Sequence, residues 1–301
     1  MINSNPTILL AASYNLMIAA FDTQTGGGIC EFEIQNTQAN RLIVAPDNRF
    51  FAASYSYVFA YDFHSKVKKA TQAIVAHEGN VTDLTVSNNM FITCGDDKGV
   101  KLWDRRSSQN TSTITTKGQN NAMVYLPNSN QVIVGDETGY LSSYDIRNSN
   151  LLKSIKVDDL PIRAMSLSPD GTSFLSAAQS GITKSFRPSE TDPFVEGYTI
   201  HAHNDLQLNC KYSPNGKYFA TCAANNTARI WDAKTGDMKQ NLVPSEMREW
   251  IWDVCFTPDS TQLCIGGTEA TCRTFDVENG RISMSFQQLD KCVSAIAILS
   301  L

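Results

Sequence analysis

The sequence predicts an all-β protein made of seven similar units. An aromatic residue recurs along the chain at steps of 40, 42, 41, 42, 45 and 44 residues. Short apolar runs alternate with turns that contain Pro followed by Asp or Asn, which is typical of strands joined by tight turns. No stretch of about eleven residues keeps the 3.6-residue apolar period of an amphipathic helix. Because the 301 residues divide into seven units of 43, we expect a single domain over residues 1–301 with almost no helix.

The recurring aromatic residue closes each unit, and Asp follows it in six of the seven. These aromatic residues are Phe21, Tyr61, Trp103, Tyr144, Phe186, Trp231 and Phe275. The exception is Phe186, which is followed by Arg187. The most complete copy of the motif runs from Thr93 to Asp104 and ends in a Trp-Asp pair.

Within a unit, three or four short strands are expected. Residues 42–45 and 50–54 are apolar runs separated by the turn Pro46-Asp47-Asn48. Proline presets the first turn dihedral, and an Asp or Asn side chain bonds the backbone two residues on. The same turn chemistry recurs at residues 126–129, 168–171, 213–216 and 257–260.

Short strands at this period with a Trp-Asp mark resemble the WD-repeat family over the whole chain. The resemblance implies a seven-bladed β-propeller, in which four-stranded blades surround a central channel. The chain starts with the second strand of a blade at Ile8–Ala11 and ends with a lone strand at Val293–Leu299. We therefore expect the C-terminal strand to become the innermost strand of the first blade, which then comprises residues 8–34 and 292–299. Such closure leaves no open sheet edge.

Charge and composition exclude several classes of protein. The chain has 25 basic and 30 acidic residues, a net charge of −5, and no block of like charge that could follow a phosphate backbone. We expect no nucleic-acid partner. The longest early apolar run, Leu16–Phe21, is too short to span a membrane, and the first basic residue is Arg41. The eight cysteines are scattered without a C-x-x-C pair, which favours small buried hydrophobes. These features predict a cytoplasmic protein without a signal peptide or direct membrane insertion.

Two sets of polar residues resemble the buried hydrogen-bonded tetrad of WD repeats. The sets are His77, Thr93, Asp97 and Trp103, and His203, Thr221, Asn225 and Trp231. A hydrolase would also use a His, an Asp and a hydroxyl group, but Asn225 in the Asp position would disable a catalytic triad while still making hydrogen bonds. We interpret both sets as structural.

No metal or cofactor site is expected. His201 and His203 have a spacing that zinc ligands can use, but the nearby sequence lacks the further ligands of a structural zinc site. The glycine run 26–28 lacks the Lys and the following helix of a phosphate-binding loop.

Trp250 and Trp252 depart from the repeat and are candidates for function. They precede the turn at Pro258 by eight and six residues, which puts both at the start of an innermost strand and on the same side of it. The equivalent pairs are Gln38 and Asn40, Gln119 and Asn121, Pro161 and Arg163, and Leu206 and Leu208. The strand starts converge at one mouth of the channel, so this mouth is expected to carry amides, leucines and two indoles, a composition typical of an interface core. The alternative is that both indoles fill the core between blades.

Several short strings along the chain narrow the resemblance further. They are Trp250-Ile251-Trp252, Ala12-Ser13-Tyr14, Gly95-Asp96-Asp97, Trp103-Asp104-Arg105-Arg106-Ser107, Ile133-Val134-Gly135-Asp136, Ala202-His203 and Ala220-Thr221-Cys222. With these strings the chain resembles the WD-repeat subunits of target-of-rapamycin (TOR) kinase complexes. The resemblance implies a non-catalytic propeller, monomeric in itself, that docks on the kinase catalytic domain, stabilises its active form, and assembles with other TOR complex subunits. It implies that Gln38, Asn40, Trp250 and Trp252 take part in that contact, and that the protein reaches endomembranes with its complex.

Other functions remain as alternatives. One is a different WD-repeat scaffold, such as a G-protein-β-like or ribosome-associated propeller. A phosphopeptide reader would need clustered arginines, and Arg41, Arg163 and Arg248 stand at non-equivalent positions. An enzyme would need convergent carboxylates or a metal set in the channel, and neither recurs in register.

Overall fold

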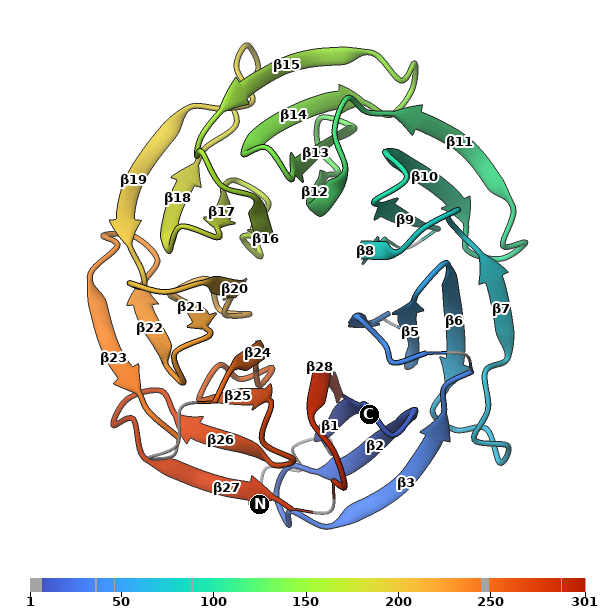
Figure 1. Cartoon of the computed structure of the whole chain (residues 1–301), viewed down its shortest axis with the longest axis vertical. Helices are drawn as coiled ribbons and strands as arrows, with labels where there is room; N and C mark the ends of the chain where they lie inside the picture. The colour runs from blue at the N-terminus through green and yellow to red at the C-terminus, as the bar shows by residue number, and fades with distance from the viewer. Residues whose placement is uncertain are drawn as a thin grey trace.

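Seven four-stranded antiparallel sheets form a ring around a central channel, as Figure 1 shows. The structure is a computed structural model, which describes residues 7–35, 37–45, 47–87, 89–244, 249–287 and 289–300. The described residues contain strands and turns but no helix, so the predicted all-β, seven-bladed propeller is confirmed. With no helix among them, these residues also contain no helical segment that could cross a membrane. Pro46 of the first predicted turn and Arg248 lie outside the described residues.

Each blade consists of four strands, ordered here from the channel outward. Blade 1 contains β28 (Val293–Ser300), β1 (Thr7–Ser13), β2 (Met17–Asp22) and β3 (Gly28–Glu33); blade 2 contains β4 (Arg41–Val44), β5 (Arg49–Ser54), β6 (Tyr57–Asp62) and β7 (Gln72–Val75); blade 3 contains β8 (Val81–Val86), β9 (Met90–Gly95), β10 (Gly99–Asp104) and β11 (Asn110–Thr115); blade 4 contains β12 (Asn120–Leu126), β13 (Gln131–Asp136), β14 (Tyr140–Asp145) and β15 (Leu151–Lys156). Blade 5 contains β16 (Ile162–Leu167), β17 (Phe174–Ala178), β18 (Ile182–Phe186) and β19 (Glu196–His201); blade 6 contains β20 (Gln207–Tyr212), β21 (Tyr218–Ala223), β22 (Ala228–Asp232) and β23 (Met238–Leu242); blade 7 contains β24 (Ile251–Phe256), β25 (Gln262–Gly267), β26 (Cys272–Asp276) and β27 (Ile282–Phe286).

The Pro-Asp turns join the innermost strand of a blade to its second strand. In blade 5, Asp170 accepts hydrogen bonds from the Ser168 hydroxyl at 2.6 Å and from the Thr172 backbone N–H at 3.0 Å. Gly171 has a φ of 70°, a left-handed conformation that glycine adopts without a steric penalty. The turn therefore follows from local residue chemistry, as predicted from the sequence.

The ring is closed by strands from the two ends of the chain. β28 pairs antiparallel with β1, with Leu9 opposite Ile298 and Leu10 opposite Ala297. In Figure 1 the red β28 lies next to the blue β1 and occupies the innermost place of the first blade. The predicted closure of the ring is therefore correct, and every blade has four strands.

The closing aromatic residues fill the core between neighbouring blades. Tyr61 of blade 2 is fully buried, its ring stacks on that of Phe50 at 4.9 Å, and both pack against Phe32 of blade 1. Truncating a buried Phe to Ala costs about 3–5 kcal/mol. These residues therefore hold the ring together, which leaves its exposed surfaces for function.

Candidate functional site: one mouth of the channel

A β-bulge at the second residue of the innermost strand shapes one mouth of the channel. Six of these strands carry such a register shift in the described residues, at Thr82, Asn121, Arg163, Leu208, Trp252 and Ser294. In blade 2 the equivalent residue is Asn40, whose backbone N–H donates to the carbonyl of Ala53 at 2.7 Å. A bulge re-aims a side chain relative to the regular strand.

These seven residues all line one depression of 450 Å³ at the mouth. Gln38, Asn80, Arg41 and Tyr14 complete its wall. The structure thus brings together Gln38, Asn40 and Trp252, three of the four residues expected at the partner contact. They meet because equivalent positions of the seven blades converge around the channel. Most of the lining side chains are polar but uncharged, with Leu208 and Trp252 as apolar members, and among the described lining residues only Arg41 and Arg163 carry a charge.

Trp250, the fourth residue, lies next to this depression. Its side chain is 41% exposed, and its ring lies 5.9 Å from that of Trp252. Trp252 is half-buried and meets Tyr14 of blade 1 edge-on at 6.1 Å. The Trp252 indole N–H is buried and has no hydrogen-bond partner among the described residues. The two indoles therefore differ in role. Trp252 partly fills the gap to blade 1, as expected of a core residue, whereas Trp250 is available at the surface, as expected of a contact residue.

The backbone of Trp250 is fixed by its neighbours in β25 and the turn that follows. Its N–H donates to the Thr268 hydroxyl at 3.0 Å, and its carbonyl accepts from the Thr268 N–H at 2.9 Å. A Cβ at Gly267 would lie 1.9 Å from that carbonyl oxygen. Glycine at 267 is thus needed for this close approach, which presents the indole on a rigid support.

Below the mouth, Arg41 reaches across the channel. Its guanidinium donates to the carbonyl of Arg163 in blade 5 at 3.4 Å and lies 3.5 Å from the carboxylate of Asp83 in blade 3. Burial works against the charge of Arg41, but the carboxylates of Asp83 and Asp253 outweigh that cost and raise the pKa of Arg41. Burial also raises the pKa of Asp253. This cross-channel link joins blades that are far apart in the sequence.

The first predicted tetrad forms as a chain of hydrogen bonds. The Trp103 indole donates to Thr93 Oγ1 at 3.0 Å, Thr93 Oγ1 lies 2.8 Å from His77 Nε2, and His77 Nδ1 lies 2.8 Å from Asp97. Because an indole can only donate, the Thr93 hydroxyl is free to donate to Nε2, and Nδ1–H then donates to Asp97. Burial lowers the pKa of His77 against the opposing effect of Asp97.

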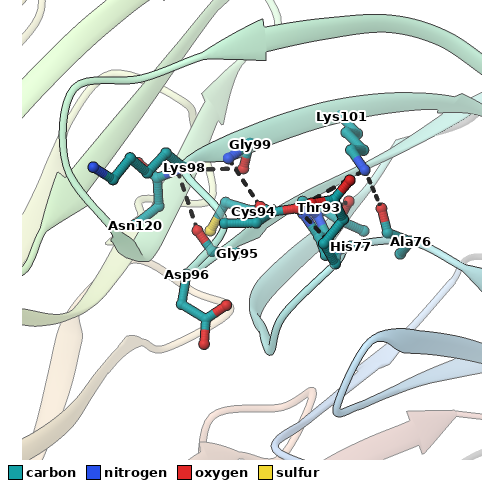
Figure 2. A network of polar contacts seen from close by, with 12 residues as sticks. Ala76, His77, Thr93, Cys94, Gly95, Asp96, Lys98, Gly99, Lys101 and Asn120 are labelled. Atoms are coloured by element: carbon teal, nitrogen blue, oxygen red, sulfur yellow. Dashed lines mark hydrogen bonds and ion pairs between the residues drawn. The ribbon is translucent and has the colours of Figure 1, made fainter.

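Figure 2 shows the surroundings of this tetrad, with Lys101 donating to the Ala76 carbonyl and Asn120 reaching in from blade 4. Asn120 donates to the Gly99 carbonyl at 3.2 Å. The set is enclosed by its own blade and the next, so it connects elements of the fold.

The second set differs from the prediction in one residue. His203 Nε2 lies 2.8 Å from Thr221 Oγ1, which also accepts from the Trp231 indole at 2.9 Å. However, His203 Nδ1 faces Thr227 Oγ1 at 3.1 Å, and Thr227 in turn donates to Asn225 at 2.5 Å. In the first set Asp97 contacts the imidazole directly. In the second set Thr227 takes that place, and Asn225 is linked to His203 only through the Thr227 hydroxyl.

The two histidines considered as zinc ligands lie in different environments. His201 is exposed at the end of β19, whereas His203 is buried in the second tetrad. The described residues contain no group of three His, Cys, Asp or Glu side chains placed to hold a metal ion.

Four mouth residues were not among the sequence candidates: Tyr14, Asn80, Thr82 and Ser294. The equivalent positions were counted back from a turn proline, and the blades of Thr82 and Ser294 have no proline after the innermost strand. Counting back from the closing aromatic would have found Thr82, which precedes Trp103 by 21 residues just as Asn40 precedes Tyr61.

The structure defines this chain as a seven-bladed β-propeller, and two of its blades contain a hydrogen-bonded tetrad that resembles the one of WD repeats. The family model described as "WD domain, G-beta repeat" matches residues 68–104 and 195–232, and each range contains one of the two tetrads. Within this class, the chain is similar to curated subunits of TOR complexes. It is 25% identical to the "Target of rapamycin complex subunit LST8" of Bos taurus over 98% of this chain and 96% of the relative. It is 26% identical to "Target of rapamycin complex subunit wat1" of Schizosaccharomyces pombe, over 75% and 74% of the two chains. The resemblance drawn from the sequence strings is thereby confirmed.

Proposed function

We propose that this protein is a non-catalytic subunit of a TOR kinase complex, and that it binds the kinase catalytic domain through the mouth of its channel and stabilises the active kinase. The observation that carries the proposal is the exposed Trp250 ring beside Trp252, on the rim of a depression lined mainly by uncharged side chains. The Bos taurus relative, which is named as a TOR complex subunit, matches nearly the whole chain and supports the same assignment.

The composition of the mouth suits a protein partner. Aromatic residues in the centre of an interface contribute most of the binding energy, and uncharged amides at the edge provide hydrogen bonds. Trp250 and Trp252 offer the aromatic area, and Gln38 and Asn40 offer the amides. Truncating one such anchor costs about 2–4 kcal/mol, or about thirty- to a thousandfold in affinity.

The rigidity of the mouth favours tight binding of a preformed partner surface. Thr268 and Gly267 hold the Trp250 backbone, and the link from Arg41 to Asp83 and Arg163 braces the channel wall. A surface that is already ordered loses little conformational entropy on association. We further propose that the protein acts in the cytoplasm and reaches endomembranes with its complex.

The proposal is tested by affinity capture of the tagged protein from its own cell extract, followed by quantitative mass spectrometry. We expect a TOR-type kinase in an amount equimolar with the bait, together with other TOR complex subunits. Ribosomal proteins or G-protein γ-type subunits in place of the kinase would favour the alternative, a different WD-repeat scaffold.

A further inference from the structure

A second candidate surface lies between blades 5 and 6, at the ends of the innermost strands that point away from the Trp250 mouth. The groove has a volume of 460 Å³ and includes the turn at Asp170. Arg163 is the second residue of β16 and lies at the mouth, whereas Asp170 follows the far end of the same strand. The groove is therefore on the opposite face of the ring and separate from the proposed kinase contact.

Arg187 is the feature of the groove that departs from the repeat. In the other six blades, an Asp after the closing aromatic accepts the backbone N–H two residues on; these residues are Asp22, Asp62, Asp104, Asp145, Asp232 and Asp276. Arg187 cannot do so. Its loop is held instead by Asp192, which accepts the Phe194 N–H at 2.8 Å, and by Ser189, whose hydroxyl accepts the Asp192 N–H at 3.0 Å. The turn thus does not require the Arg187 side chain.

Arg187 and Lys234 both line the groove, one from each blade. Both are exposed, and across the described part of the chain neither side chain makes a hydrogen bond or an ion pair. The hydroxyls of Ser173 and Tyr212, 3.3 Å apart, lie in the same groove. The one acidic residue of the lining, Asp170, is occupied by Ser168 and Thr172, and these hydrogen bonds lower its pKa. Among the described residues, the lining therefore carries one carboxylate and two cations that make no hydrogen bond or ion pair.

The groove between blades 7 and 1 provides an internal comparison. It has a volume of 610 Å³ and contains the equivalent turn, with Asp259 in the place of Asp170. Gln24 stands where the first groove has Lys234, and the residue equivalent to Arg187 is Asp276. Its lining holds no Lys or Arg among the described residues. The same architecture thus occurs with and without the cationic pair, so the pair is not needed to build the groove.

We propose that the groove between blades 5 and 6 binds a carboxylate side chain of an acidic protein segment. Arg187 can hold a carboxylate through two parallel hydrogen bonds, and Lys234 adds a second charge-assisted bond. With Asp170 present, the lining has a net charge of +1 by count of these three residues, which one carboxylate balances. A phosphate, with a charge of about −1.5 to −2, would leave the groove with a net negative charge and would be repelled by Asp170.

The test is binding of a fluorescein-labelled, acetylated octapeptide of alternating Ala and Glu, followed by fluorescence anisotropy at low salt. We expect Arg187→Asp and Lys234→Glu each to weaken binding by about tenfold or more. Arg187→Asp restores the residue found in the other blades and is expected to fold. The matched control is Arg281→Asp, which makes the same charge change at an exposed residue of blade 7 and should leave binding within about twofold.

Several results would overturn the proposal: equal binding by the Arg187→Asp variant, equal binding of a peptide with Gln for Glu, or no saturation by about 1 mM protein. Tighter binding of the phosphoserine version of the peptide would also overturn it, in favour of a phosphate site. None of these results bears on the Trp250 mouth, since the peptide assay contains no kinase.

Discussion

The Asp253 carboxylate accepts a hydrogen bond from the backbone N–H of Ile296, with Oδ2 and N 2.9 Å apart. Asp253 belongs to β24 of blade 7 and Ile296 to β28 of blade 1, so this bond joins the last blade to the closing strand. The other oxygen of Asp253 accepts from the side-chain amide of Asn209 in blade 6 at 2.6 Å. One buried side chain thus links three consecutive blades.

Replacing this carboxylate should destabilise the ring. We expect Asp253→Ala to lower the free energy of unfolding by about 2–4 kcal/mol, because the partners of Asp253 are left buried without an acceptor. Asp253→Asn should cost less, since the amide retains one acceptor oxygen. Urea denaturation measures both. Equal stability of the Ala variant and the wild type would show that the link between blades contributes nothing.

Removal of the closing strand should have a larger effect. Deleting residues 292–301 takes away the innermost strand of blade 1 and exposes the edge of β1, which is buried from Ile8 to Ser13. An exposed apolar strand edge promotes aggregation. We expect insoluble protein, or a product without a cooperative melting transition in calorimetry. A soluble truncated protein with an unchanged melting curve would refute closure as the source of stability.

The tetrads should contribute to stability through the threonine at their centre. Thr93→Val and Thr221→Val each leave a buried indole N–H and a histidine nitrogen without a partner. The expected loss is about 1–3 kcal/mol in each case, measured by chemical denaturation. Thr115→Val changes an exposed residue of β11 and serves as the control. A loss no greater than that of the control would argue against the tetrads as structural units.

Stability should decrease on acidification because of His203. Burial, with a further effect of the Arg229 charge, lowers the pKa of His203 to about 3. An unfolded histidine has a pKa of about 6.5, so the unfolded state binds more protons between these values. The stabilisation is complete above about pH 6.5 and decreases as the pH falls toward 3, by about 1–2 kcal/mol between pH 6.5 and pH 5.

The variant His203→Gln should flatten this part of the pH profile of unfolding, whereas His64→Gln, at an exposed position, should not. If both variants keep the wild-type slope, His203 is not the titrating group.

Much of the fold could be predicted because it depends on local chemistry repeated seven times. The turn at Ser168–Gly171 and the closing aromatic Tyr61 are each determined by a few adjacent residues. The positions of Asn40 and Trp252 around one mouth followed from counting, since equivalent residues of a propeller converge. By contrast, the contact of Arg41 with the Arg163 carbonyl crosses the channel, and no sequence period relates the two.

The contact of His203 with Thr227, where the sequence predicted Asn225, was missed for a related reason. Both residues lie in one turn, and only the geometry of that turn decides which side chain faces His203. Tyr14 was missed as a mouth residue because its contact with Trp252 spans the point of ring closure.

The most direct test of the proposed function is capture of the TOR-type kinase by protein carrying both Trp250→Ala and Trp252→Ala. The matched control carries Leu151→Ala and Leu152→Ala, which removes two exposed apolar side chains from the outer strand of blade 4. The comparison requires that both variants have the melting temperature of the wild type. We predict that the tryptophan variant loses the kinase, by about thirtyfold or more in affinity, while the leucine variant captures it as the wild type does. Undiminished capture by the folded tryptophan variant would contradict the assignment of the channel mouth as the kinase-binding surface.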